Sequence, residues 1–109
     1  KEAMLKFKEE FIRSRETICR RLDRLPKLFS YRKPHGAYYV FPKIIGFDNL
    51  STLDFAKLLV DEAKVITIPG SAMGPAGDRH LGLSFAAKSD YINLAFDRLD
   101  SFAKNLGLL

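Results

Sequence analysis

Apolar residues recur every three or four positions in three long segments, which predicts three amphipathic helices. The first helix is predicted over residues 2–25, and Pro26 ends it because proline cannot continue the backbone hydrogen bonds. The apolar positions that define the three helical stripes are Met4, Phe7, Phe11, Ile18, Leu22 and Leu25, then Phe55, Leu58, Leu59 and Ala63, and finally Ile92, Ala95, Phe96, Leu99, Phe102, Ala103 and Leu106.

Polar residues and glycine mark the ends of the second and third helices. Ser51 or Thr52 caps the second, with a carboxylate following in the manner of a capping box. Ser89-Asp90 starts the third, since a side-chain oxygen and a negative charge both suit a helix N-terminus. Gly107 is expected to close it in a left-handed conformation.

Four shorter segments rich in β-branched and aromatic residues predict strands. They are Leu28–Arg32, Ala37–Phe41, Val65–Ile68 and Leu81–Phe85. Lys33–Gly36 predicts a turn between the first two, and the third reads as a largely buried run. The expected order is α-β-β-α-β-β-α. This order predicts an α+β fold, with helices packed on a small mixed or antiparallel sheet, and residues 1–109 forming one domain.

Composition excludes several classes of protein. With 47% hydrophobic and 28% charged residues, the chain is typical of a globular domain. It holds neither an apolar run of the ~20 residues that a membrane helix needs nor a secretory signal pattern. Cys19, the single cysteine, excludes an internal disulfide and fits a reducing cytoplasm. It reads as a small buried apolar residue, since His35 and His80 lie in unrelated contexts for a nucleophilic pair.

Positive charge is concentrated near the N-terminus. Residues 1–33 hold eleven Lys or Arg against five Asp or Glu, whereas the remainder holds seven against eight. A basic helix is one feature of nucleic-acid-binding modules. The charges mostly fall opposite the apolar stripe, as on a solvated helix face, and no aromatic stacking platform accompanies them. Nucleic-acid binding is therefore the weaker interpretation.

Three ordered motifs carry a family resemblance. Phe11–Glu16 reads FIRSRE, Pro34–Pro42 reads PHGAYYVFP, and Val65–Ala87 reads VITIPGSAMGPAGDRHLGLSFAA. Together they resemble the C-terminal small domain of class I/II (fold-type I) pyridoxal-phosphate-dependent aminotransferases, in the aspartate and aromatic branch. The positions that match the family's last motif are Val65, Pro69, Gly70, Gly74, Gly77, His80, Leu81, Leu83, Ser84, Phe85 and Ala86.

The resemblance implies the C-terminal part of a larger enzyme that moves an amino group between an amino acid and a 2-oxo acid. In that family the pyridoxal-phosphate lysine, the phosphate cradle and the pyridinium partner belong to the large domain, so none maps onto this chain. The chain by itself is expected to be inactive and to hold no cofactor. Its partners would be the large domain of the same polypeptide, the substrate and, in the parent, a second subunit in a cytoplasmic homodimer. The chain starts inside a helical pattern without methionine, which favours a fragment.

One residue position carries the chemistry that the family assigns to this domain. An arginine on the last strand binds the substrate α-carboxylate in the family, and Gly82 stands at that position here. Arginine suits the task because its planar fork matches a carboxylate. His80 and Arg79 are weak substitutes. Arg79 would point to the opposite face and reads better as a solvated loop residue beside Asp78.

Other motifs predict less. Ser101–Lys104 echoes the family's lysine motif, but it lies in an amphipathic helix, so Lys104 reads as a surface lysine. The glycine-rich loop Pro69–Gly77 lacks the order of a phosphate-binding loop and leads into a strand. No residues have metal-ligand spacing. The alternative to an aminotransferase fragment is a stand-alone, non-catalytic module of the same fold. The substrate and the oligomeric state of the fragment stay open.

Overall fold

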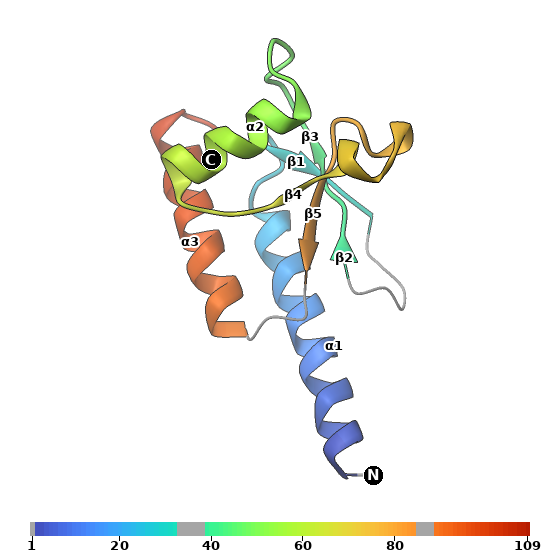
Figure 1. The fold of residues 1–109 in the computed structure, drawn as a ribbon. Coiled ribbons are helices and arrows are strands. Elements are labelled where there is room, and N and C mark those ends of the chain that lie inside the picture. The colour runs from blue at the N-terminus through green and yellow to red at the C-terminus, as the bar shows by residue number, and fades with distance from the viewer. Residues whose placement is uncertain (1, 33–38, 85–88) are drawn as a thin grey trace.

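The computed structural model describes residues 2–32, 39–84 and 89–109 and shows helices packed around small antiparallel sheets (Figure 1). The elements in chain order are α1 (Glu2–Asp23), β1 (Phe29–Ser30), β2 (Tyr39–Val40), β3 (Lys43–Ile44), α2 (Thr52–Leu58), the π-helical turn η1 (Leu59–Ala63), β4 (Ile68–Pro69), the 3₁₀ turns η2 (Gly70–Met73) and η3 (Pro75–Gly77), β5 (Leu81–Ser84) and α3 (Ser89–Asn105). The predicted α+β class is confirmed.

The predicted turn between the first two strands suggests that they pair with each other, but the structure pairs the first strand with a third. β1 pairs with β3, a two-residue strand too short for the sequence pattern to predict. β5 lies between β2 and β4, with Val40 opposite Leu83 and Ile68 opposite Gly82. A single bridge between Lys43 and His80 joins the two sheets. The predicted turn before β2 lies outside the described residues.

The core forms where α1, α3 and the α2–η1 segment meet the strands. In Figure 1 the C-terminal half of α1 lies beside α3, while its N-terminal half projects away from the remainder. The stripes predicted for the three helices supply most of the buried hydrophobic residues. The largest fully buried side chains are Phe55, Ile18, Leu22, Leu25, Leu28, Ile44, Leu59, Leu81, Leu99, Val40 and Pro42.

The run before β4 corrects one expectation. Ile66 is 86% exposed and Ile68 40% exposed, so Val65–Ile68 is not a largely buried strand. The hydrogen-bonded strand begins only at Ile68, and the N–H of Val65 instead donates to the carbonyl of Leu59. Leu106 is also half exposed rather than part of the core stripe. Alternation and helical spacing select a face, but the neighbouring elements decide how far it is covered.

The predicted caps at Ser51 and Gly107 are confirmed. The Ser51 hydroxyl accepts a hydrogen bond from the N–H of Asp54 at 3.1 Å, which identifies Ser51 as the N-cap of α2. After Asn105, Gly107 has a φ of 71° and its N–H donates to the carbonyl of Lys104. The N–H of Leu108 donates to the carbonyl of Ala103, which completes a Schellman motif.

One charge of α1 is buried against α3. The guanidinium of Arg21 donates to Asp97 at 2.7 Å, to Asp100 at 2.8 Å and to the side chain of Asn93 at 2.9 Å. Burial opposes the charged form, yet the hydrogen bonds and charges of both carboxylates raise the pKa of Arg21 above its ordinary value. Arg21 is thus an exception to the solvated basic face that the sequence predicts.

A second polar contact closes the end of α1. The phenol of Tyr31 lies 2.6 Å from a carboxylate oxygen of Asp23 and 2.9 Å from the carbonyl oxygen of Cys19. Burial, followed by the neighbouring carboxylate, raises the pKa of Tyr31 above its ordinary range. Cys19 itself is buried, as expected of a small apolar residue. These contacts tie the segment after Pro26 back onto α1.

Candidate functional site

Position 82 lies on β5, the central strand of the three-stranded sheet. Leu81 is fully buried in the core, and side chains alternate along a strand, so position 82 faces away from the core. Ile68 lies directly opposite Gly82 in the register. The backbone of Gly82 is buried, and the glycine offers no charged group on this face. The position that the resemblance assigns to carboxylate binding is therefore a neutral site beside an isoleucine.

The loop that leads into β5 is held by two glycines in direct backbone contact. A Cβ atom added at Gly70 would lie 2.3 Å from the carbonyl oxygen of Gly77, and one added at Gly77 would lie 2.0 Å from that of Gly70. The N–H of Gly70 also donates to the carbonyl of His80 at 2.7 Å. Only glycine permits this approach, so the two turns η2 and η3 close on each other.

Arg79 binds the loop between β3 and α2. Its guanidinium donates to the carbonyls of Phe47 at 3.2 Å, Leu50 at 3.4 Å and Ile44 at 3.4 Å, and also to that of Gly46. It lies 3.6 Å from a carboxylate oxygen of Asp48, and its side chain is 24% exposed. The expectation of a solvated loop arginine is therefore wrong, because main-chain carbonyls surround its donors.

The backbone of Arg79 is fixed by a network that the sequence did not predict. Arg79 has a φ of 67°, a conformation that non-glycine residues seldom adopt. The buried hydroxyl of Thr52 accepts from the N–H of Arg79 and donates to the carboxylate of Asp78, both at 2.8 Å. No spacing rule connects Thr52 with residues 26 positions away, so only the fold brings them together.

His80 lies at the junction of the two sheets and not in a catalytic cluster. Its Nδ1 is 2.8 Å from the carbonyl oxygen of Asp78, and the side chain is partly buried. An imidazole can still present its second nitrogen, but one such group is a poorer carboxylate ligand than an arginine fork. Across the parts of the chain that the structure describes, no three His, Cys, Asp or Glu side chains gather as a metal site.

A covalently bound pyridoxal phosphate needs a lysine in an enclosed site, so the exposure of the lysines matters. Every lysine whose side chain the structure describes is exposed, including the one in the superficial lysine motif. These residues are Lys27, Lys43, Lys57, Lys64 and Lys104. None lies in an enclosed site, and none adjoins a helix N-terminus built to hold phosphate.

Comparison with known proteins follows this geometry. The chain is 34% identical over 110 residues to aromatic-amino-acid aminotransferase 2 of Thermococcus litoralis, covering 99% of this chain and 27% of the relative. It is 35% identical over 101 residues to an aspartate aminotransferase of Pyrococcus abyssi, covering 91% of this chain and 25% of the relative. No family model matches the chain.

Solved structures agree with the sequence comparison. The aromatic aminotransferase of Pyrococcus horikoshii superposes with a TM-score of 0.87 at 30% identity, over 99% of this chain and 28% of that one. An alanine aminotransferase from Pyrococcus furiosus superposes with a TM-score of 0.88 at 28% identity, over 95% of this chain and 26% of that one.

The chain belongs to the fold-type I aminotransferases and corresponds to their C-terminal region. It spans about a quarter of the length of the relatives that it matches. The resemblance read from the three motifs is thereby confirmed. Within the described ranges, no helix is long and apolar enough to cross a membrane.

Proposed function

We propose that this chain serves as the small domain of a pyridoxal-phosphate-dependent aminotransferase that transfers an amino group between an amino acid and a 2-oxo acid. The observation that carries the proposal is the match to aminotransferases along 99% of the chain, in sequence and in fold. The domain would close over the substrate and exclude water from a site built mainly by a large domain. The parent would be a cytoplasmic homodimer, and residues 1–109 one folding unit.

The cofactor does not fit the residues of this chain whose side chains the structure describes. Pyridoxal phosphate requires a lysine for its covalent linkage and donors for its phosphate. The described lysines are exposed, and the loop of Gly70 and Gly77 is filled by its own backbone contact. The large domain would therefore supply the cofactor site in full, and the small domain would contribute shape and closure.

Incubating the 109-residue chain with pyridoxal phosphate and then borohydride is expected to give no stoichiometric labelling of any one lysine. The reason is that a solvated lysine forms only weak, reversible adducts with the aldehyde. Mass spectrometry of tryptic peptides measures the labelling. The longer protein encoded by the same reading frame is the control, with one label expected per chain. Stoichiometric labelling of a single lysine in the 109-residue chain would contradict the proposal.

Position 82 would contact the substrate side of the parent's active site, and here it lacks the family's charge. Gly82 lies opposite Ile68, whereas the donors of Arg79 are engaged by the loop carbonyls. His80 is the weak remaining substitute on the same face. A substrate carboxylate would therefore be bound less strongly by this domain than an arginine would bind it.

In the longer protein, Gly82→Arg is expected to lower the KM for amino-acid substrates by about tenfold, since a charge-assisted bidentate pair replaces a neutral contact. Gly82→Met is the matched control, because it adds a long side chain without the charge. Steady-state kinetics with both variants separates charge from bulk. Equal KM values for the arginine and methionine variants would show that another group already holds the carboxylate.

The alternative is a stand-alone module of this fold without catalytic activity, favoured by Gly82 and by the exposed lysines. The two hypotheses differ in one observable. If the chain is a stand-alone module, it should not occur as part of a longer transcript or protein. Binding to nucleic acid, the third hypothesis, would require affinity that falls steeply with salt. Failure to bind DNA or RNA at low salt would exclude it.

A further inference from the structure

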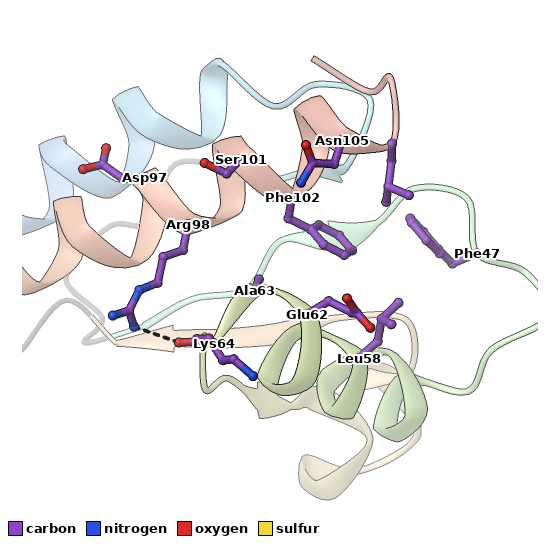
Figure 2. A pocket seen from close by; sticks show the side chains of 11 residues that line it. Phe47, Leu58, Glu62, Ala63, Lys64, Asp97, Arg98, Ser101, Phe102 and Asn105 are labelled. Atoms are coloured by element: carbon purple, nitrogen blue, oxygen red, sulfur yellow. Dashed lines mark hydrogen bonds between the residues drawn. The ribbon is translucent and has the colours of Figure 1, made fainter.

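A groove lies between η1 and α3, outside the region of position 82. It encloses about 580 Å³, within the range of small-molecule sites. Figure 2 shows α3 forming one wall and the α2–η1 segment the other, with the ring of Phe102 between them, whereas Asp97 and Ser101 point away from the α2–η1 segment. Gly82 and Arg79 do not line it, although Phe47, whose carbonyl accepts a hydrogen bond from Arg79, does. The groove is therefore a different feature from the site described above.

One end of the groove is apolar. Phe47, Leu58, Phe102 and Leu106 line this end, and the ring of Phe47 packs at 4.9 Å from that of Phe55. Phe102 is only 7% exposed and forms part of the core, whereas Leu106 is 50% exposed. Phe102 thus belongs to a buried floor, while the edge at Leu106 is open to solvent. Burying that edge would favour an apolar ligand group.

The other end of the groove is cationic. Arg98 donates to the main-chain carbonyl of Lys64 at 3.0 Å, and in Figure 2 the Lys64 side chain points away from the Arg98 guanidinium. Lys64 in turn donates to the carbonyl of Asp61 at 2.9 Å. Both cations bond to main-chain oxygens, and no carboxylate among the described residues pairs with either. An anionic group of a ligand could therefore pair with the guanidinium of Arg98.

The two acidic residues of the rim are not equivalent. Asp97 is bound to Arg21 at 2.7 Å, so its charge is already compensated. Glu62 lies beside Leu58 on the opposite wall and has no counter-ion within the described part of the chain. Among the described residues, Arg98 and Lys64 thus have no carboxylate partner, and Glu62 has no cationic partner. The balance favours a ligand with a single negative charge and disfavours a second one at the apolar end.

Uncommon backbone conformations border the same groove. Phe47 has a φ of 56° and Lys64 a φ of 58°, both in the left-handed region that bulky residues rarely adopt. Between α2 and Lys64 the chain forms the π-helical turn η1, a feature often found at functional sites. The Arg79 guanidinium holds the Phe47 carbonyl at 3.2 Å. The fold thus maintains strained backbone where the groove is formed.

We propose that this groove binds a small monocarboxylate with an aromatic or branched apolar group. The apolar group would lie against Phe102, one helical turn from Arg98 on α3, and the carboxylate would bind Arg98. Such a site goes beyond the proposed function, because it is separate from the substrate position and needs no cofactor. A ligand of about eleven non-hydrogen atoms is expected to bind with a dissociation constant on the order of 1 mM.

Titrating the isotope-labelled 109-residue chain with 3-phenylpropanoate is expected to shift backbone amide resonances of η1 and α3 selectively, with saturation. The matched probe is 3-phenylpropylamine, which keeps the apolar group and reverses the charge. It is expected to bind at least about tenfold more weakly, since its ammonium group would meet the guanidinium of Arg98. Equal shifts with both probes, or no saturable shift with the carboxylate up to about 20 mM, would overturn the proposal.

Variants assign the binding to the groove. Arg98→Gln, which keeps a hydrogen-bond donor for the Lys64 carbonyl, is expected to weaken carboxylate binding about tenfold. Arg20→Gln is the matched control, because Arg20 is exposed on α1 and does not line the groove. Thermal unfolding of both variants checks that they remain folded. Equal affinity of the two variants for 3-phenylpropanoate would place the site elsewhere and contradict the proposal.

Discussion

Gly77→Ala is expected to lower the free energy of unfolding by about 3 kcal/mol. The added Cβ would lie 2.0 Å from the carbonyl oxygen and 2.6 Å from the carbonyl carbon of Gly70. These are main-chain atoms, so no side-chain rotation can relieve the overlap, and η2 and η3 must separate. Urea unfolding followed by circular dichroism measures the loss.

Gly46→Ala is the matched control for this experiment. Gly46 has a φ of 74°, and no atom lies within 4 Å of a Cβ added there. The variant adds the same methyl group and carries only the conformational cost of the left-handed region, about 1 kcal/mol. Similar urea midpoints for the two variants would show that the loop yields easily and that the Gly70–Gly77 contact contributes little.

Arg21→Met is expected to destabilise the domain by about 3 kcal/mol, because it breaks an ion pair at a buried interface and leaves a carboxylate behind. The side chain of Arg21 is 7% exposed and that of Asp100 is 17% exposed. Methionine restores most of the apolar length but none of the hydrogen bonds. Arg24 lies 3.4 Å from Asp100 and would still compensate part of that carboxylate's charge in the variant. This remaining contact limits the loss of stability.

Asp97→Asn serves as the control, since its carboxylate also binds Arg21 but is 67% exposed. The variant is expected to cost about 0.5 kcal/mol, as solvent screens an exposed partner. Comparing the urea midpoints of Arg21→Met and Asp97→Asn separates buried from exposed pairing. Equal losses would contradict the view that Arg21 locks α1 onto α3.

The helices could be predicted because their information is local. The α1 stripe of Ile18, Leu22 and Leu25 repeats at helical spacing, and these residues are buried. Ser51 and Gly107 mark helix ends through bonds to residues a few positions away. Strands were less predictable, since a two-residue strand such as β3 is defined by its partner β1 and not by its own pattern.

The candidate site divides in the same way. The motif around Gly82 identified the family and the position without its arginine, and the register with Ile68 now places that position in the centre of a sheet. The prediction that Arg79 is solvated was wrong, because its guanidinium donates hydrogen bonds to carbonyls of residues 44–50, in a different part of the chain. Carbonyls belong to every residue and leave no trace in the sequence.

By itself, the sequence determined the fold class, the positions of the three helices, the family and the missing charge at Gly82, because these depend on periodicity, capping and ordered motifs. The tertiary structure decided what lies across from each residue. It paired β1 with β3, buried Arg21 against α3, exposed Ile66 and opened a groove beside Arg98. The physical reason is that burial and electrostatic pairing depend on distances between segments that no local pattern encodes.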